Sequence, residues 1–247
     1  MHKKHILVAS LLIGVFSCFF HADARAGISE GTVYLESVQN EDGSWGSDPS
    51  LVFFETAEAT RILGEVGISG SSYQNGIEFI KNELIEGVED YSLRINSLFP
   101  AGEDVTDDLN QLVDAQNDDG GWGFTLSYNS NVYHTSLALQ ALTTAGFYDD
   151  DVIGSALSFI CFQQNSDGGF GFVENDSSTY YSSVVVLTLK EYLLEYQFLQ
   201  SYIDLASSYL LTQKNPDGSF GIEENRIFET ALASRALIAT GKFSEGL

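Results

Sequence analysis

The chain has 247 residues, 44% of them hydrophobic, which is enough to bury the core of one globular domain. Its formal net charge of −24 at pH 7 argues against nucleic acid or an anionic membrane surface as a partner. Only three prolines and no polar tract argue against a long disordered segment.

The first 26 residues predict a signal peptide. Two lysines near the start are followed by an apolar run over Ile6–Phe20, and the small residues Ala24 and Ala26 then occupy the −3 and −1 positions of a cleavage site. We therefore expect the mature protein to begin at Gly27 and to be secreted, periplasmic or bound at the cell surface.

Residues 27–247 are expected to form one domain. A lipoprotein anchor at Cys18 is the alternative, although the preceding residues make a poor lipobox. Cys161 is then the only cysteine of the mature chain, which excludes an internal disulfide and a cysteine-based zinc cage. Its apolar neighbours predict a buried, unreactive thiol. No other apolar run reaches the length of a transmembrane helix.

A short motif recurs four times along the chain. The copies read QNEDGSWG from Gln39, QNDDGGWGF from Gln116, QNSDGGFG from Gln164 and QKNPDGSFG from Gln213. The last three copies lie 48 and 50 residues apart, and a first gap of 77 residues leaves room for one more unit with an eroded motif. A regular spacing of about 50 residues indicates a repeat architecture.

Each motif separates two helical patterns, an amphipathic one before it and a more apolar one after it. The apolar helices are predicted over residues 56–66, 135–145, 182–192 and 230–240. Serine and threonine near their starts suggest N-caps, and Gly67, Gly146 and Gly241 suggest C-caps. The eroded unit pairs residues 74–84 with 91–99. The chain therefore reads as an all-α protein of about five helix pairs, with the apolar helix of each pair inside.

We interpret the motif as a structural lock between neighbouring outer helices rather than a catalytic or calcium site. The Asp-Gly pair makes a tight turn, the aromatic residue covers it, and the glutamine bonds to the next outer helix. The residues assigned to these turns are Gln39, Asp42, Gly43, Trp45, Gln116, Asp119, Gly120, Trp122, Gln164, Asp167, Gly168, Phe170, Gln213, Asp217, Gly218 and Phe220.

The pattern Gln-x-x-Asp-Gly-x-(Trp/Phe)-Gly between helix pairs resembles the QW repeats of squalene and oxidosqualene cyclases and the repeats of protein prenyltransferase β-subunits. The resemblance covers nearly all of residues 27–247. It implies an α/α toroid in which parallel inner helices lie within outer ones. Five helix pairs are fewer than a closed toroid of this kind contains, so closure of the ring stays open.

The catalytic motifs of that superfamily are absent. Squalene-cyclase-like enzymes carry Asp-x-Asp-Asp-Thr-Ala, and the nearest match, Asn131–Ser136, lacks all three aspartates. The zinc-binding Asp, Cys and His of prenyltransferases have no counterpart, because Cys161 falls on an outer helix. We therefore expect neither a metal nor another cofactor.

The positions at the start of the inner helices would gather at one rim of the toroid, beside several aromatic residues. Carboxylates, one histidine and aromatic rings together could bind a sugar or a peptide. The simpler interpretation is that glutamate favours a helix N-terminus and that aromatic residues fill the core. The candidate rim residues are Glu55, Tyr133, His134, Tyr180, Tyr181, Ser182 and Glu229.

Three functional hypotheses remain open. The first is a non-catalytic binding or scaffold module with an unknown protein or glycan partner. The second is a divergent terpene cyclase-like enzyme with Glu55 or Glu229 as its acid. The third is a polysaccharide-acting enzyme that uses His134.

Overall fold

The computed structural model describes residues 22–125, 128–173, 175–222 and 225–242. Over these residues the chain is all-helical, with ten helices and no strand. It forms two compact units that divide between Phe79 and Ile80. Most of the expected signal peptide, including Cys18, lies outside the described residues.

The N-terminal unit contains α2 (Ala22–Val38), α3 (Val52–Glu65) and most of α4 (Ser71–Asn82). Its core forms around Trp45, which packs with Ala59 and Leu63 of α3. Leu35 of α2 and Tyr73 of α4 cover this cluster. The aromatic residue of the first motif therefore lies at the centre of the unit.

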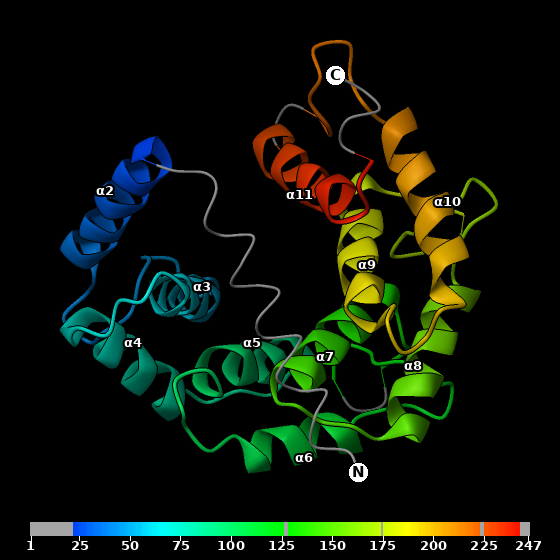
Figure 1. Cartoon of the computed structure of the whole chain (residues 1–247). Coiled ribbons are helices and arrows are strands. Elements are labelled where there is room, and N and C mark those ends of the chain that lie inside the picture. The colour runs from blue at the N-terminus through cyan, green and yellow to red at the C-terminus, as the bar shows by residue number, and fades with distance from the viewer. Residues whose placement is uncertain (1–21, 126–127, 174, 223–224, 243–247) are drawn as a thin grey trace. The chain divides into compact units, whose positions relative to one another are not determined.

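The C-terminal unit alternates inner and outer helices, as Figure 1 shows. The inner helices α5, α7, α9 and α11 pack against one another in succession, and α6, α8 and α10 lie on their outer side. The helix bounds are α5 (Val88–Leu98), α6 (Thr106–Asp114), α7 (Val132–Thr144), α8 (Asp150–Phe162), α9 (Thr179–Tyr192), α10 (Leu199–Thr212) and α11 (Arg226–Ala239). The ten helices expected for the five pairs, including α4 and α5 for the eroded unit, are thus present in the described part of the chain.

The inner helices begin three or four residues earlier than predicted, and a serine caps α9 as expected whereas an asparagine caps α7. Asn131 and Ser178 cap α7 and α9, because their side chains accept the backbone N–H groups of His134 and Tyr181. Thr135 and Ser182 lie in the first helical turn instead, where their hydroxyls have another partner.

Glycines end the inner helices as predicted. Gly67, Gly146 and Gly241 have φ angles of +81°, +65° and +73°, a region that glycine enters without steric cost. The next residue in each case donates its N–H back to the helix, for example Phe147 to the carbonyl of Leu142. Across the described residues, none of the helices combines the length and the apolar character needed to cross a membrane.

Candidate functional site

The hydroxyl groups in the first turns of four inner helices hold the motif loops. The backbone N–H of each motif aromatic residue donates to one of them, over 2.8–2.9 Å. The pairs are Trp45 with Thr56, Trp122 with Thr135, Phe170 with Ser182, and Phe220 with Thr230. Ser182 is fully buried in this contact, so it belongs to the motif lock and not to the rim.

The motif glutamines join neighbouring outer helices. Gln116 donates through Nε2 to the carbonyl of Gly120 in its own turn and to that of Val152 in α8. Gln39 and Gln164 make the equivalent pairs of bonds, to α4 and α10 respectively. The indole N–H of Trp122 reaches back 2.7 Å to the carbonyl of Leu112 in α6. Each such loop therefore ties the preceding outer helix to the following one.

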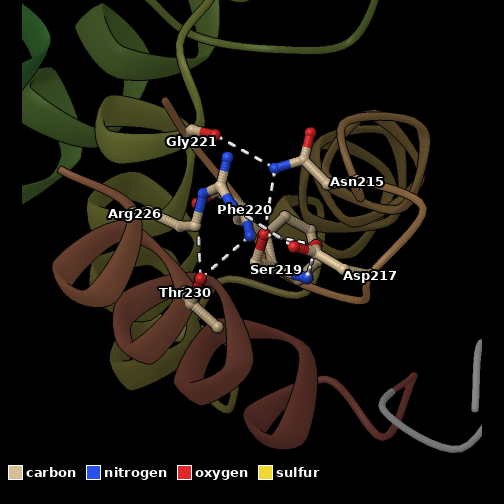
Figure 2. A network of polar contacts seen from close by, with 7 residues as sticks. All are labelled: Asn215, Asp217, Ser219, Phe220, Gly221, Arg226 and Thr230. Atoms are coloured by element: carbon tan, nitrogen blue, oxygen red, sulfur yellow. Dashed lines mark hydrogen bonds and ion pairs between the residues drawn. The ribbon is translucent and has the colours of Figure 1, made fainter. Parts of the chain in front are cut away.

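The motif aspartates and asparagines organise the turn itself. Asp217 accepts from both the N–H and the hydroxyl of Ser219, while Asn215 donates to that hydroxyl and to the carbonyl of Gly221 (Figure 2). Arg226 adds an ion pair to Asp217 at 3.3 Å. The hydrogen bonds that Ser219 donates lower the pKa of Asp217. The asparagine has a role that the sequence interpretation missed, although it stands in all four copies of the motif.

Two copies of the motif have glycine where the others have serine, and a serine from further along the chain replaces the missing hydroxyl. Ser130 donates to Asp119 at 2.7 Å, and Ser177 donates to Asp167 at 2.8 Å. A Cβ on Gly121 would lie 2.6 Å from the Cβ of Ser130, so glycine is needed to admit that residue. In all four copies the motif aspartate therefore accepts a hydrogen bond from a serine hydroxyl.

The glutamates proposed as catalytic acids pack against the last glycine of their own motifs. A Cβ added to Gly46 would overlap the carboxylate of Glu55, and one on Gly221 would come within 2.8 Å of the Glu229 carboxyl carbon. Burial raises the pKa of Glu229. Glu55 has one buried oxygen without a hydrogen-bond partner among the described residues. Both carboxylates therefore occupy a place shaped by the motif loop.

His134 is buried at the start of α7, with 5% of its surface exposed. Its Nδ1 lies 2.8 Å from the side-chain nitrogen and 3.1 Å from the oxygen of Asn131. The rings of Phe124 and Tyr133 lie against it, with centroids 5.8 and 5.2 Å away. Burial lowers the pKa of His134, so the imidazole is neutral at pH 7.

The residue two positions before each locking hydroxyl is aromatic: Phe54 in the N-terminal unit, and Tyr133, Tyr180 and Phe228 in the C-terminal unit. Residues two apart on a helix are separated by about 200° around its axis, so these rings face away from the motif loops. In the C-terminal unit the rings touch in series. The centroids of Tyr133 and Tyr180 lie 5.8 Å apart, and those of Tyr180 and Phe228 lie 5.7 Å apart. We call Tyr133, Tyr180 and Phe228 the aromatic row.

Further rings and one carboxylate extend the aromatic row. Tyr181 packs edge-on against Tyr180 at 5.0 Å, and Phe172 packs on Tyr181 at 5.8 Å. At the other end the Tyr133 hydroxyl donates to Glu89 of α5 at 2.7 Å. The structure thus brings four predicted rim residues together, Tyr133, His134, Tyr180 and Tyr181, with the expected Phe228 beside them, and adds Glu89 and Phe172.

The row combines solvent exposure with uncharged hydrogen-bonding groups. Phe228 is 57% exposed, and Tyr133, Tyr180 and Tyr181 are half-buried. Burial raises the pKa of all three tyrosines, and the neighbouring Tyr180 hydroxyl and Glu89 carboxylate raise that of Tyr133 further. The tyrosine hydroxyls therefore stay protonated near neutral pH.

Three other kinds of candidate site among the described residues each offer less than the aromatic row. A polar hollow of about 440 Å³ borders the second motif, but its Asn117 and Asp119 are already bonded within the lock. Within the described ranges, no three metal-ligating side chains cluster. Burial raises the pKa of the Cys161 thiol to about 12, in agreement with a buried, unreactive cysteine.

Comparison with known proteins identifies the fold. No family model matches the sequence, and no curated protein matches it. A protein from Actinoplanes superposes with a TM-score of 0.71 at 16% identity, over 88% of this chain and 84% of that one. The ent-copalyl diphosphate synthase from Streptomyces platensis superposes with a TM-score of 0.65 at 17% identity, over 85% of this chain.

The chain has the α/α-toroid fold of the terpene cyclases. It matches 46% of the length of the copalyl diphosphate synthase, so the likeness concerns one part of that enzyme. At such low identity the likeness extends to the fold and leaves the chemistry to the residues of the site. The start of α7 carries the buried His134 and no carboxylate.

Proposed function

We propose that this protein is a non-catalytic binding module that holds its ligand against the aromatic row. The observation that carries the proposal is the repeat of an aromatic residue at one position of successive inner helices, with the rings in contact and partly exposed. Phe228 is more than half exposed, so core packing does not account for its aromatic ring. Its contact with Tyr180 makes it part of an exposed aromatic patch. Aromatic surfaces with a few polar groups are typical of ligand sites.

The surroundings of Glu55, Glu229 and His134 argue against catalysis. Protonation of an alkene needs an acidic carboxyl directed at the substrate. Glu229 packs on Gly221 and Glu55 on Gly46, which supports a structural origin for both carboxylates. His134 is covered by Phe124 and Tyr133, which argues equally against a histidine-dependent polysaccharide-cleaving enzyme.

The test has two parts. Incubation of the purified protein with squalene and with geranylgeranyl diphosphate, followed by mass spectrometry, is expected to give no product. Thermal-shift measurements with isoprenoid, glycan and peptide probes are expected to give a ligand that stabilises the wild type more than Phe228→Ala. A cyclised product that disappears in Glu229→Gln would establish the enzymatic alternative instead.

We also propose that the protein acts outside the cytoplasm. The support is the charged, apolar and small-residue sequence of the first 26 residues. Fractionation of the producing cells, with N-terminal sequencing of the recovered protein, tests this. A protein that begins at Gly27 in the exported fraction is expected, and an unprocessed chain in the cytoplasm would contradict the proposal.

A further inference from the structure

We infer that the ligand of the aromatic row is an uncharged glycan chain whose sugar rings stack on the aromatic faces. This inference rests on the proposed function and names the chemical class of ligand. Three properties of the row support it: its continuous surface, its uncharged polar groups and the acidity around it.

The rings of the aromatic row touch one another in series and form one unbroken surface, the platform. Tyr133, Tyr180 and Phe228 follow one another at 5.8 and 5.7 Å, so each ring touches the next and leaves no gap for a side chain to enter. Tyr133 and Tyr180 are tilted by 43°, and Tyr180 and Phe228 by 33°. Steps of this size are close to the length of one sugar in a linear hexose chain. Successive sugars of such a chain can therefore lie along successive rings of the row, and the Phe228 ring, which is 57% exposed, is the most open of them.

Hydrogen-bonding groups lie at the edges of the platform, where the hydroxyl groups of a sugar would project. Tyr133 and Tyr180 keep their hydroxyl protons, and Glu89 keeps acceptor capacity beyond the bond it receives from Tyr133. An isoprenoid chain would cover the Glu89 carboxylate without using its remaining acceptor capacity, which is costly. A sugar satisfies both the rings and their polar edges.

The charge of the region argues against anionic glycans. Glu89 lies beside the row, and His134 is neutral. The two basic residues of α11 already have acidic neighbours: Arg226 pairs with Asp217 at 3.3 Å, and Arg235 acts on Glu191. The net charge of −24 adds long-range repulsion of any polyanion.

A proline-rich peptide is the main competing ligand, because aromatic residues also bind polyproline helices. Such recognition uses grooves between aromatic rings. The rings of the row are in contact at 5.8 and 5.7 Å, so they leave no groove between them for a proline ring. The platform geometry therefore favours the sugar.

The experiment is isothermal titration calorimetry of the purified protein with cellohexaose, laminarihexaose and N-acetylchitohexaose. Oligogalacturonate, a polyproline peptide and farnesol serve as anionic, peptide and isoprenoid probes. We expect at least one neutral hexasaccharide to bind and oligogalacturonate not to bind. Phe228→Ala is expected to weaken binding about tenfold, the loss of one stacked ring.

Three further variants make the result specific. Phe228→Leu keeps apolar bulk but removes the flat face, so it is expected to lose binding to a similar degree without unfolding. Tyr180→Phe keeps the ring and removes one hydrogen bond, with an expected loss of about threefold. Tyr148→Ala, which removes a ring that is 75% exposed beyond the opposite end of α7, is the matched control and is expected to bind normally.

The outcomes separate the two proposals. Binding of the polyproline peptide or farnesol in place of a glycan, with the same dependence on Phe228, would overturn the glycan inference and leave the binding module intact. Binding of oligogalacturonate would likewise overturn the choice of an uncharged glycan. If no probe binds, or if binding is equal in the wild type and in Phe228→Ala, both proposals fail.

Discussion

Thr135 and Tyr133 lie two residues apart in the first turn of α7, and their surroundings differ in every respect. Thr135 is fully buried and accepts the N–H of Trp122, whereas Tyr133 lies in a half-exposed row of rings and donates to Glu89. The same contrast recurs in α9 between Ser182 and Tyr180. Each repeat therefore places a structural contact on one side of the inner helix and a potential binding surface on the other.

This contrast explains why the motif loops are so rich in special residues. Their polar side chains are engaged with one another or with the backbone, which leaves them little capacity for a ligand. The aromatic row has ring faces that no locking contact requires. Substitutions in the two regions should therefore separate stability from binding.

The largest loss of stability is expected for Trp122→Ala. Trp122 is fully buried and its indole bonds to Leu112, so truncation leaves a cavity and an unpaired carbonyl. The free energy of unfolding should fall by about 3–5 kcal/mol in denaturant titrations. Phe124→Ala, which removes a ring that is 51% exposed, is the control and should cost less than about 1 kcal/mol. Equal losses would show that the motif tryptophan is not central to the fold.

A smaller loss is expected for Thr135→Val, which keeps the shape and removes the acceptor of the Trp122 N–H. A buried amide without a partner costs about 1–3 kcal/mol. Thr135→Ser retains the hydroxyl and should restore most of the stability. Ligand binding should be unchanged in both variants, and a selective loss of affinity in Thr135→Val would break the proposed separation.

The motif glutamines provide an internal comparison. Gln116 bonds to Gly120 and to Val152 and Ser155 of α8, whereas Gln213 bonds only to the adjacent Thr212 among the described residues. Gln116→Ala should lower the free energy of unfolding by about 1–2 kcal/mol, and Gln213→Ala by less than about 0.5 kcal/mol. Equal effects in thermal or chemical unfolding would contradict the role of the glutamine as a link between outer helices.

The smallest effect concerns pH. The pKa of His134 is lowered by burial below its usual value of 6.5, so the unfolded chain takes up the proton first as the pH falls. The free energy of unfolding of the wild type should therefore decrease below about pH 6.5, relative to that of His134→Gln. Parallel pH profiles of the two proteins would show that His134 titrates normally.

The repeat made most of the fold predictable from the sequence. Four copies of the motif fixed the positions of the helix pairs, and the C-terminal glycines fixed the ends of three inner helices. The N-termini were misplaced, because threonine and serine suit both an N-cap and a first-turn contact. The true caps, such as Asn131, stand in loops whose geometry depends on the motif bonds.

The candidate site was only partly predictable. The tyrosines at the start of α7 and α9 are visible in the sequence as residues beside the locking hydroxyls. Glu89 belongs to the repeat unit whose motif has eroded, so the residue could not be aligned with the helix starts of the other units. Only the hydrogen bond from Tyr133 reveals its place beside the row. Ser182 was assigned to the rim because it stands near the start of an inner helix. Its hydroxyl instead bonds to Phe170, and this contact depends on the path of the motif loop.

The most direct test of the separation between lock and row is to measure stability and binding on the same preparation of Phe228→Ala. The free energy of unfolding should stay within about 1 kcal/mol of the wild type, since this ring is 57% exposed, while affinity for the bound hexasaccharide falls about tenfold. A protein that loses several kcal/mol of stability and keeps its affinity would contradict the account, because the row would then be part of the core.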